Sequence, residues 1–298
     1  MTITAKVIAD SISPEGIRLT TMQLRYPRFI HAEFMTHRVF SRNASSSRAI
    51  PVKKMIEDLR RDPAMPIYWG SNKPGMQAGA ELNDVAVRLC QATWLEGVEA
   101  AIHYAEEMMG LGLHKQIANR ILEPWAHINV VVTATEWANF YALRRHEDAQ
   151  PEIKALADAM WDAQQASRPE PLETGSWHQP FVTGEDVDPA CEHQTEDMGY
   201  VEVLNRISVA RCARVSYLTH DGRQTTVEED LALYDRLVGS QPLHASPAEH
   251  QATPDKSHTK ILQGGDGEFT WDTPELHGNL RGWIQYRKTL PHENVEGA

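Results

Sequence analysis

The spacing of apolar residues changes along the chain, and this change limits the fold more than any other feature. Apolar and polar residues alternate in KVIA (residues 6–9) and RLTTMQLRY (residues 18–26), and Ser13-Pro14-Glu15-Gly16 separates the two segments. Alternation is typical of strands, and Pro with Gly is typical of a turn, so we expect a hairpin. From Glu81 to Met109 the apolar residues recur at helical spacing, and glycines follow. The sequence therefore predicts a mixed α/β fold in which helix exceeds strand.

Further helical patterns follow the long one. We predict helices over residues 114–122, from about 133 to 143, from 151 onward and over 201–217. Capping boxes at Thr226 and Ser246 mark two more helix starts. Cys90 lies in the apolar stripe of the 81–109 helix and is expected in the core, whereas the Pro- and Gly-rich residues 63–80 are expected to form a loop.

A segment without periodicity separates two parts of the chain. Residues 166–199 hold four prolines and many acids, which is typical of a linker. We therefore divide the chain into an N-terminal part at 1–165, a linker at 166–199 and a C-terminal part at 200–298. Cys191 and His193 lie in the linker, but no second pair of ligands has matching spacing, so we expect no metal site.

The composition excludes several classes of protein. No run of about eighteen apolar residues is present, so no membrane span is expected, and the first residues lack the pattern of a secretory signal. Three scattered cysteines fit a reducing compartment, and we expect a cytoplasmic protein, in the host if a phage encodes it. A net charge of −12 argues against non-specific binding to nucleic acid.

The charge is unevenly distributed along the chain. Between Ile17 and Lys54 there are eight basic residues and one acid, Glu33, so this basic segment carries +7 in a chain of net charge −12. A basic segment in an acidic protein can form a focused anion site. It can equally form a solvated face whose charges pair with acids from elsewhere in the chain. The charge pattern alone leaves both interpretations open.

Polar side chains are densest between Thr36 and Arg48, in the sequence THRVFSRNASSSR. Arginine forks and hydroxyl donors are suited to binding phosphate. A second polar cluster begins at Asn139, and because adjacent helical arginines point in different directions, at most one of Arg144 and Arg145 should face a site. No cysteine lies in the motif of a catalytic nucleophile, so covalent catalysis by cysteine is not expected.

The first cluster resembles the signature of the flavin-dependent thymidylate synthases. The pattern His37-Arg38-x-x-Ser41-x-Asn43-x-x-Ser46-x-Arg48 is similar to their R-H-R-x-x-S-x-N-E-x-S-x-R. Four other segments are similar to further blocks of that family: Arg120-Ile-Leu-Glu-Pro124 to R-I-x-L-P, residues 139–153 to N-x-x-x-L-R with A-Q-x-E-I, Ala213-Arg-Val-Ser-Tyr217 to A-R-V-S, and His244-x-Ser-Pro-x-Glu-His250 to H-x-S/T-P-F-E-H.

The order of these blocks differs from the usual order in the family. The last two blocks normally precede the arginine-rich signature, whereas here they follow it. The resemblance therefore implies a circularly permuted, phage-type member in which residues 200–298 complete the domain that residues 1–165 begin. It also implies a helix-rich fold around a small mixed sheet, and a homotetramer whose active sites are shared between subunits.

The resemblance implies roles for individual residues. FAD would be contacted by His37, Arg38, Asn139, Ser216, Ser246 and Glu249. A pyrimidine deoxynucleotide monophosphate would be held by Glu33, Ser46, Arg48, Arg120 and Arg144. The two catalytic residues would be Arg144, which stabilises charge developing on the pyrimidine, and His244, which lies near the flavin and the folate.

The implied reaction uses NADPH to reduce FAD and transfers a methylene group from methylenetetrahydrofolate to C5 of dUMP, where it becomes the methyl group of dTMP. The chain departs from the family pattern at four single positions and one tripeptide: Thr36 for Arg, Ala44 for Glu, Glu33 for Gln, Asp148 for His, and Thr133-Ala-Thr135 for N-L-R. These departures leave two alternatives open. One is the same chemistry on dCMP or ending in a hydroxymethyl group, and the other is a catalytically silent relative that binds nucleotides or a partner protein.

Overall fold

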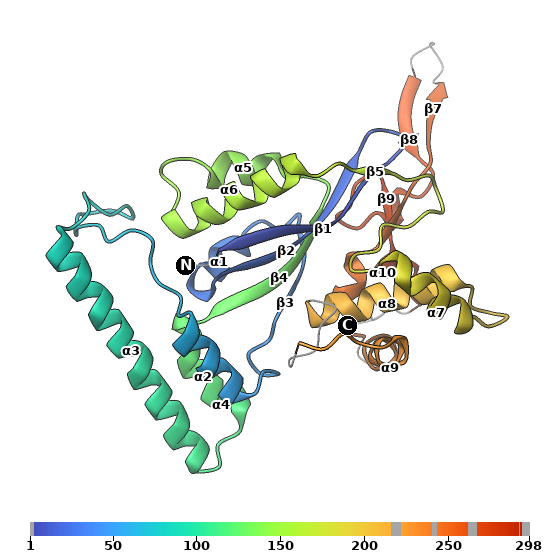
Figure 1. Ribbon diagram of the computed structural model, residues 1–298. Coiled ribbons are helices and arrows are strands. Elements are labelled where there is room, and N and C mark those ends of the chain that lie inside the picture. The colour runs from blue at the N-terminus through green and yellow to red at the C-terminus, as the bar shows by residue number, and fades with distance from the viewer. Residues whose placement is uncertain (1–2, 216–221, 240–242, 262–266, 292, 294–298) are drawn as a thin grey trace, which may run out of the picture.

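A five-stranded sheet forms the centre of the computed structural model, which describes residues 3–215, 222–239, 243–261, 267–291 and 293. The strand order is β3-β4-β2-β1-β5 (Figure 1). The predicted hairpin is confirmed: β1 (Thr4–Ile12) and β2 (Arg18–Pro27) are antiparallel, and Gly16 takes the positive φ of 78° that the turn requires. β4 (His127–Ala134) pairs antiparallel with β2 and with β3 (Ser41–Ala44), and β5 (Glu170–Pro171) runs parallel to β1.

One face of the sheet is covered by helices and holds the largest core. The covering elements are η1 (Arg28–Ile30), α1 (His31–Phe34), α5 (Ala138–Arg144) and α6 (Pro151–Ala166). The helix predicted from residue 151 begins at Pro151. Its four expected core residues are all fully buried: Ile153, Leu156, Ala157 and Met160. The 3.6-residue apolar period therefore identified both the helix and its buried face.

A second helical layer packs beside the end of the sheet. It consists of α2 (Val52–Arg61), α3 (Asp84–Gly110), α4 (Lys115–Ala118) and η2 (Asn119–Trp125). In α3 the buried residues lie between Val98 and Ala105 only, and the first half of the helix extends along the outside of the protein (Figure 1). The expectation that Cys90 is a core residue is therefore wrong, because Cys90 is half-buried on that outer half. No helix in the described ranges is long and apolar enough to cross a membrane.

The opposite face of the sheet is covered by C-terminal elements. The helix α8 (Tyr200–Arg214) packs against this face, and η3 (Gly184–Asp186), α7 (Val187–Glu192) and α9 (Val227–Val238) pack around α8. Val131 of β4 packs against Phe181, Cys212 and Val215. Residues 166–199, which the composition marks as a linker, include β5, η3 and α7 and bury His178 and Phe181.

Short elements complete the C-terminal part. They are η4 (Ser246–Glu249), β6 (Ala252–Pro254), β7 (Ser257–Ile261), β8 (Gly267–Trp271), η5 (Pro274–Leu276), β9 (Trp283–Gln285) and α10 (Tyr286–Thr289). The capping box predicted at Thr226 is present at the start of α9. The one predicted at Ser246 is wrong: the segment is a four-residue 3-10 turn, and the Ser246 hydroxyl bonds Asn43 instead of capping.

The expectation of a helix from residue 133 is also wrong. Residues 127–134, HINVVVTA, form the interior strand β4 between β3 and β2, and α5 begins only at Ala138. A strand that is buried on both faces is a continuous apolar run, without alternation of apolar and polar residues. The spacing of its apolar residues therefore did not identify β4 as a strand. The predicted helix at 114–122 is divided between α4 and the 3-10 helix η2.

A chain of buried polar side chains crosses the sheet and joins it to the C-terminal part. His178 bonds Ser11 through Nδ1 (2.8 Å) and Thr21 through Nε2 (2.7 Å). Thr133 bonds both Thr21 (2.6 Å) and Nδ1 of His250 (2.8 Å). Burial lowers the pKa of each histidine to about 3, so both rings are neutral near pH 7.

Candidate functional site

A cavity of about 820 Å³ collects four of the predicted site residues. His37 and Arg38 reach it from the segment after α1, and Asn139 and Arg144 reach it from α5. Its wall is completed by these residues: Arg18, Thr36, Val39, Thr135, Glu136, Trp137, Ala138, Phe140, Leu143 and Gln164. The cavity therefore joins the two polar clusters that are about a hundred residues apart in the sequence.

Arg144 is fixed in this cavity by two hydrogen bonds. Its Nε donates to Nε2 of His37 (2.9 Å) and its Nη2 donates to Oγ1 of Thr36 (3.1 Å). Because Nε2 of His37 accepts, the imidazole is neutral, and burial together with Arg144 lowers its pKa. Thr36 gives Arg144 an acceptor at a position where the family signature has a third cation.

The His37 ring is held by aromatic neighbours. It stacks on Phe40 with a centroid distance of 5.8 Å and meets Phe140 edge-on at 4.9 Å. Only 7% of His37 is exposed. A ring packed in this way presents its nitrogen to Arg144 in one orientation, so the Arg144 guanidinium is positioned by the core of the protein.

Two carboxyl groups, those of Glu33 and Glu152, lie close enough to interact, and the first also feels the charge of Arg144. Glu33 is half-buried, its Oε2 is buried without a hydrogen-bond partner among the described residues, and burial raises its pKa against the attraction of Arg144. Glu152 is buried and accepts a hydrogen bond from the backbone of Ile67 (2.7 Å). Gln77 donates to Asp148 (2.6 Å), so the loop at 63–80 is attached beside this site.

The three predicted phosphate-binding residues lie on another surface. Ser46 and Arg48 are exposed in the loop after β3, and none of Ser46, Arg48 and Arg120 lines the cavity of Arg144. The loop rests on η2, because Asn119 donates to the carbonyl of Ser47 (2.6 Å). Arg120 pairs with Glu123 at 2.9 Å on the same element. The structure therefore brings Ser46 and Arg48 close to the element that carries Arg120, but apart from Arg144.

The C-terminal residues of the prediction lie at the edge strand of the sheet. Ser246 donates to Oδ1 of Asn43 (3.4 Å), and the Asn43 amide donates to the carbonyl groups of Cys212 (2.7 Å) and Ala213 (3.2 Å). Glu249 forms an ion pair with Arg287 of α10. His244 is exposed, and Ser216 lies outside the described residues.

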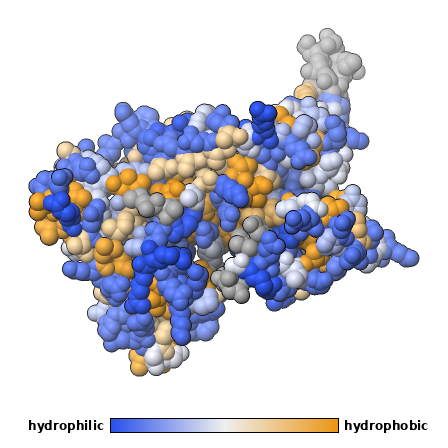
Figure 2. Space-filling model, in the orientation of Figure 1, coloured by the Kyte–Doolittle hydropathy of each residue, from blue (hydrophilic) through white to orange (hydrophobic). Residues whose placement is uncertain are grey.

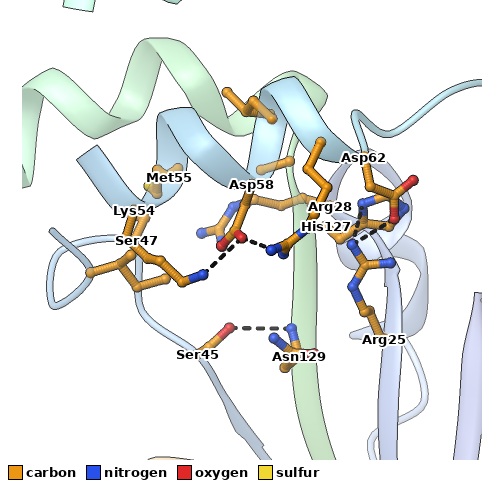
Figure 3. A pocket seen from close by; sticks show the side chains of 14 residues that line it. Arg25, Arg28, Ser45, Ser47, Lys54, Met55, Asp58, Asp62, His127 and Asn129 are labelled. Carbon is orange, nitrogen blue, oxygen red and sulfur yellow. Dashed lines mark hydrogen bonds and ion pairs between the residues drawn. The ribbon is translucent and has the colours of Figure 1, made fainter. Parts of the chain in front are cut away.

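A second, smaller cavity of about 190 Å³ shows what the basic segment does (Figure 3). Its lining includes Arg25, Arg28, Lys54 and Asp58. Four cations of the basic segment form ion pairs with acids: Arg18 with Asp10, Arg25 with Asp62, Arg28 with Glu123 and Lys54 with Asp58. These four cations are therefore paired with acids from elsewhere in the chain and do not form a free anion site. Every one of the acids lies outside residues 17–54.

Three residues of the larger cavity were not predicted from the sequence. Arg18, Thr135 and Gln164 come from the start of β2, the end of β4 and α6. Arg18 belongs to the basic segment, but nothing in its sequence context distinguished it from the other cations. The pairing of β2 with β4 brings Arg18 and Thr135 to the same end of these two strands. Because the sequence did not predict β4, it could not predict this pairing.

Comparison with known proteins gives the class of the chain. A family model described as thymidylate synthase complementing protein (Thy1) matches residues 17–170, slightly more than half of the chain. The chain belongs to this family, the flavin-dependent thymidylate synthases, and is a pyrimidine nucleotide C5-methyltransferase-like enzyme. The helix-rich fold around a small sheet agrees with the fold that the resemblance implied.

Two solved structures are similar to the chain. One is a UMP/dUMP methylase, PolB, from Streptomyces cacaoi bound with 5-Br dUMP, at 19% identity and a TM-score of 0.45 over 55% of this chain and 90% of that chain. The other is the same methylase bound with 5-Br UMP, at 19% identity and a TM-score of 0.43 over 55% of this chain and 88% of that chain. No curated protein matches the sequence.

Proposed function

We propose that the chain transfers a one-carbon unit from methylenetetrahydrofolate to C5 of dUMP, using FAD and NADPH, and forms dTMP. The observation that carries this proposal is the single cavity that joins His37, Arg38, Asn139 and Arg144 in a member of this family. NADPH and methylenetetrahydrofolate would be co-substrates, and the pyrimidine deoxynucleotide monophosphate the acceptor.

The residues of the cavity fit a flavin. Its volume lies in the range of cavities that bind cofactors, about 300–1,000 Å³. Trp137 and Phe140 give it aromatic wall, while Arg38 and Asn139 give it polar donors. The buried Thr135 Oγ1 has no partner among the described residues, and a bound polar ligand would satisfy it. When bound, FAD would supply the hydride chemistry of the reaction.

Arg144 is the residue to which we assign stabilisation of the pyrimidine. Its guanidinium is a planar fork of hydrogen-bond donors, and the bonds to His37 and Thr36 fix its orientation. A fixed donor of this kind stabilises negative charge that develops on the pyrimidine ring as C5 forms its new bond to carbon. We assign His244, on the exposed segment before η4, to the side of the flavin where the folate binds.

We further propose a homotetramer in which neighbouring subunits complete each site. Ser46, Arg48 and Arg120 would then hold the nucleotide phosphate of a site whose Arg144 belongs to another subunit. Large apolar side chains are exposed on α3, among them Val85, Leu89 and Tyr104, and orange atoms interrupt the polar surface on that side of the molecule (Figure 2). Exposed apolar patches of this kind mark interaction surfaces.

The proposal includes circular permutation and a cytoplasmic location. The contacts of Asn43 with Cys212, Ala213 and Ser246 support the permutation, because they join the two displaced blocks to the arginine-rich signature. Residues 1–165 and 200–298 would then form one permuted domain, with Ser216, Ser246 and Glu249 at the flavin. A cytoplasmic location is consistent with the free cysteines at 90, 191 and 212.

Product analysis tests the function directly. Purified protein is incubated with FAD, NADPH, methylenetetrahydrofolate and either dUMP or dCMP, and the mass of the nucleotide product is measured. Methylated dUMP is the expected product, whereas a hydroxymethyl product or a preference for dCMP would select the alternative chemistry. Protein that binds added FAD and nucleotide but gives no product with either pyrimidine would be the silent relative.

A further inference from the structure

A segment near the end of the chain, residues 278–287, contacts the arginine-rich signature, although the family model ends at residue 170. The contacts are made by two side-chain amides. Nδ2 of Asn279 donates to the carbonyl of Val39 (2.8 Å), and Oδ1 of Asn279 accepts from Nε2 of Gln285 (3.0 Å). Neither amide belongs to the residues that we assign to flavin, nucleotide or folate.

The Asn279 amide is held in one orientation. Its Oδ1 accepts from the hydroxyl of Ser41 (3.1 Å) as well as from Gln285, which leaves Nδ2 to donate to Val39. Ser41 and Gln285 are both buried. A Cβ at Gly278 would lie 2.6 Å from Oε1 of Gln285, and the φ of Gly278 is 57°, so glycine is required for this close approach.

The Val39 carbonyl belongs to the turn that carries Arg38 into the cavity. Buried rings hold the ends of this turn, because His37 and Phe40 stack on each other and are 7% and 3% exposed. The bond that closes the turn, from the Phe40 amide to the His37 carbonyl, is long at 3.4 Å. Among the described residues, Asn279 makes the only hydrogen bond to the backbone of Arg38 or Val39.

The direction of Arg38 depends on this turn. Its side chain is exposed, lines the cavity and forms no hydrogen bond or ion pair with any residue that the structure describes. The planar peptide group between Val39 and Phe40 is bonded on both edges, through its carbonyl to Asn279 and through its amide to His37. Rotation of that peptide group would break the bond to Asn279, so Asn279 limits the shapes that the turn can take.

We propose that Asn279 is a positioning residue for the ligand of this cavity: its amide fixes the turn from His37 to Phe40, and the turn directs Arg38 at the ligand. Naming the ligand rests on the proposed function, in which it is FAD. The segment 278–287 thereby acts on a cavity whose lining residues all lie between positions 18 and 164.

Asn279→Asp tests the bond to Val39. Aspartate has the size of asparagine and keeps an oxygen for Ser41 and Gln285, but it has no amide hydrogen to donate. If this variant does not fold, Asn279→Ala takes its place, because alanine removes the donor without adding a charge.

Two controls separate this bond from general effects. Asn83→Asp is the chemically matched control, since Asn83 caps α3 through its side-chain oxygen, which aspartate keeps. Tyr286→Phe is the control for stability. It removes a buried hydroxyl of the same segment whose partners, Glu202 (2.6 Å) and Tyr234 (2.8 Å), lie on α8 and α9 and not in the turn.

Hydrogen–deuterium exchange of a peptide that covers residues 36–41 measures the turn without any ligand. We expect exchange in Asn279→Asp to be about fivefold faster than in the wild type, the effect of losing one hydrogen bond. Asn83→Asp and Tyr286→Phe should leave exchange of this peptide unchanged. Unchanged exchange in a folded Asn279 variant overturns the inference.

A double-mutant cycle on FAD affinity then tests whether Asn279 acts through Arg38. We expect Asn279→Asp to weaken FAD binding about tenfold, the equivalent of ~1.4 kcal/mol, while the two controls bind as the wild type does. In an Arg38→Ala background the same change should alter the affinity less than about twofold, because the residue that it positions is gone. Equal effects in both backgrounds would show a merely structural role and overturn the inference.

The exchange measurement keeps this inference separate from the proposed function. Wild-type protein that binds no FAD would contradict the flavin-dependent reaction, and faster exchange of the turn in Asn279→Asp would still support Asn279 as the residue that positions it. Wild-type protein that binds FAD and forms dTMP, with FAD bound equally tightly by Asn279→Asp, would leave the proposed function standing and overturn the inference.

Discussion

Arg144 donates a hydrogen bond from Nε to Nε2 of His37 across 2.9 Å. The residue that we assign to binding the pyrimidine is therefore oriented by a residue that we assign to binding the flavin. His37 is itself fixed by Phe40 and Phe140, and a second bond ties Arg144 to Thr36. The position of the guanidinium therefore depends on a neutral imidazole in an aromatic setting. A change at either residue disturbs the other.

Arg144→Lys is expected to lower kcat for dTMP formation at least about a hundredfold, the usual cost of removing one preorganised donor. Lysine keeps the positive charge but cannot bond His37 and Thr36 while also facing the pyrimidine. FAD affinity and thermal stability should change little. Single-turnover rates with dUMP measure the effect.

Arg145→Lys is the matched control for this prediction. Arg145 pairs with Asp158 and lies over the Trp161 ring at 4.4 Å, away from the cavity. Its replacement should leave kcat within about twofold of the wild type. Equal rates for the Arg144 and Arg145 variants would contradict the assignment of Arg144.

The sequence predicted this site better than it predicted the strands that support it. The hairpin and α6 followed from periods of two and 3.6, and the motif resemblance selected His37 and Arg144, which the structure joins. β4 was missed because both of its faces are buried. Arg18 and Thr135 were missed with it, since only the β2–β4 pairing brings them together. The pairing of the basic segment with distant acids likewise depends on tertiary contacts.

Acid is expected to destabilise the protein through its buried histidines. The pKa of His178 and of His250 is about 3 in the folded state, against about 6.5 when unfolded, so the unfolded chain binds more protons below pH 6.5. Stability is present in full above pH 6.5 and falls as the pH drops from 6.5 toward 3. Each histidine contributes up to about 1.4 kcal/mol per pH unit in that interval.

Urea unfolding of the wild type and of His178→Gln between pH 7 and pH 5 measures this effect. Glutamine can donate to one of Ser11 and Thr21 and accept from the other, and it does not titrate. The pH slope of the variant should be smaller than that of the wild type by about 1.4 kcal/mol per unit. Identical slopes would show that the buried ring does not control acid stability.

Arg211→Met is expected to destabilise the C-terminal part by about 3–5 kcal/mol, because it leaves the buried Asp186 without its ion-pair partner and leaves the buried Asp230 with Arg214 as its only remaining arginine among the described residues. Arg211 is bonded to Asp186 (2.7 Å) and Asp230 (2.9 Å), and the Asp230 side chain is fully buried. The exposed pair of Arg223 with Glu229 is the control, and Arg223→Met should cost about 1 kcal/mol or less. Urea unfolding at pH 7 compares the two variants, and equal losses would contradict the burial argument.

Glu33→Gln is expected to tighten binding of dUMP at pH 7.5 by about threefold to tenfold, since it removes a negative charge near the residue that binds the pyrimidine. Burial raises the pKa of Glu33, so in the wild type this repulsion weakens as the pH falls and the carboxyl takes up a proton. The affinity of the wild type for dUMP should therefore move toward that of the variant as the pH is lowered from 7.5. Because the phosphate of dUMP titrates equally in both proteins, the ratio of their dissociation constants by calorimetry isolates Glu33. A ratio that does not change as the pH is lowered from 7.5 through the range where the carboxyl takes up its proton would place the Glu33 charge outside the nucleotide site. Weaker binding of dCMP by Glu33→Gln would instead indicate that the carboxylate accepts a hydrogen bond from the cytosine amine.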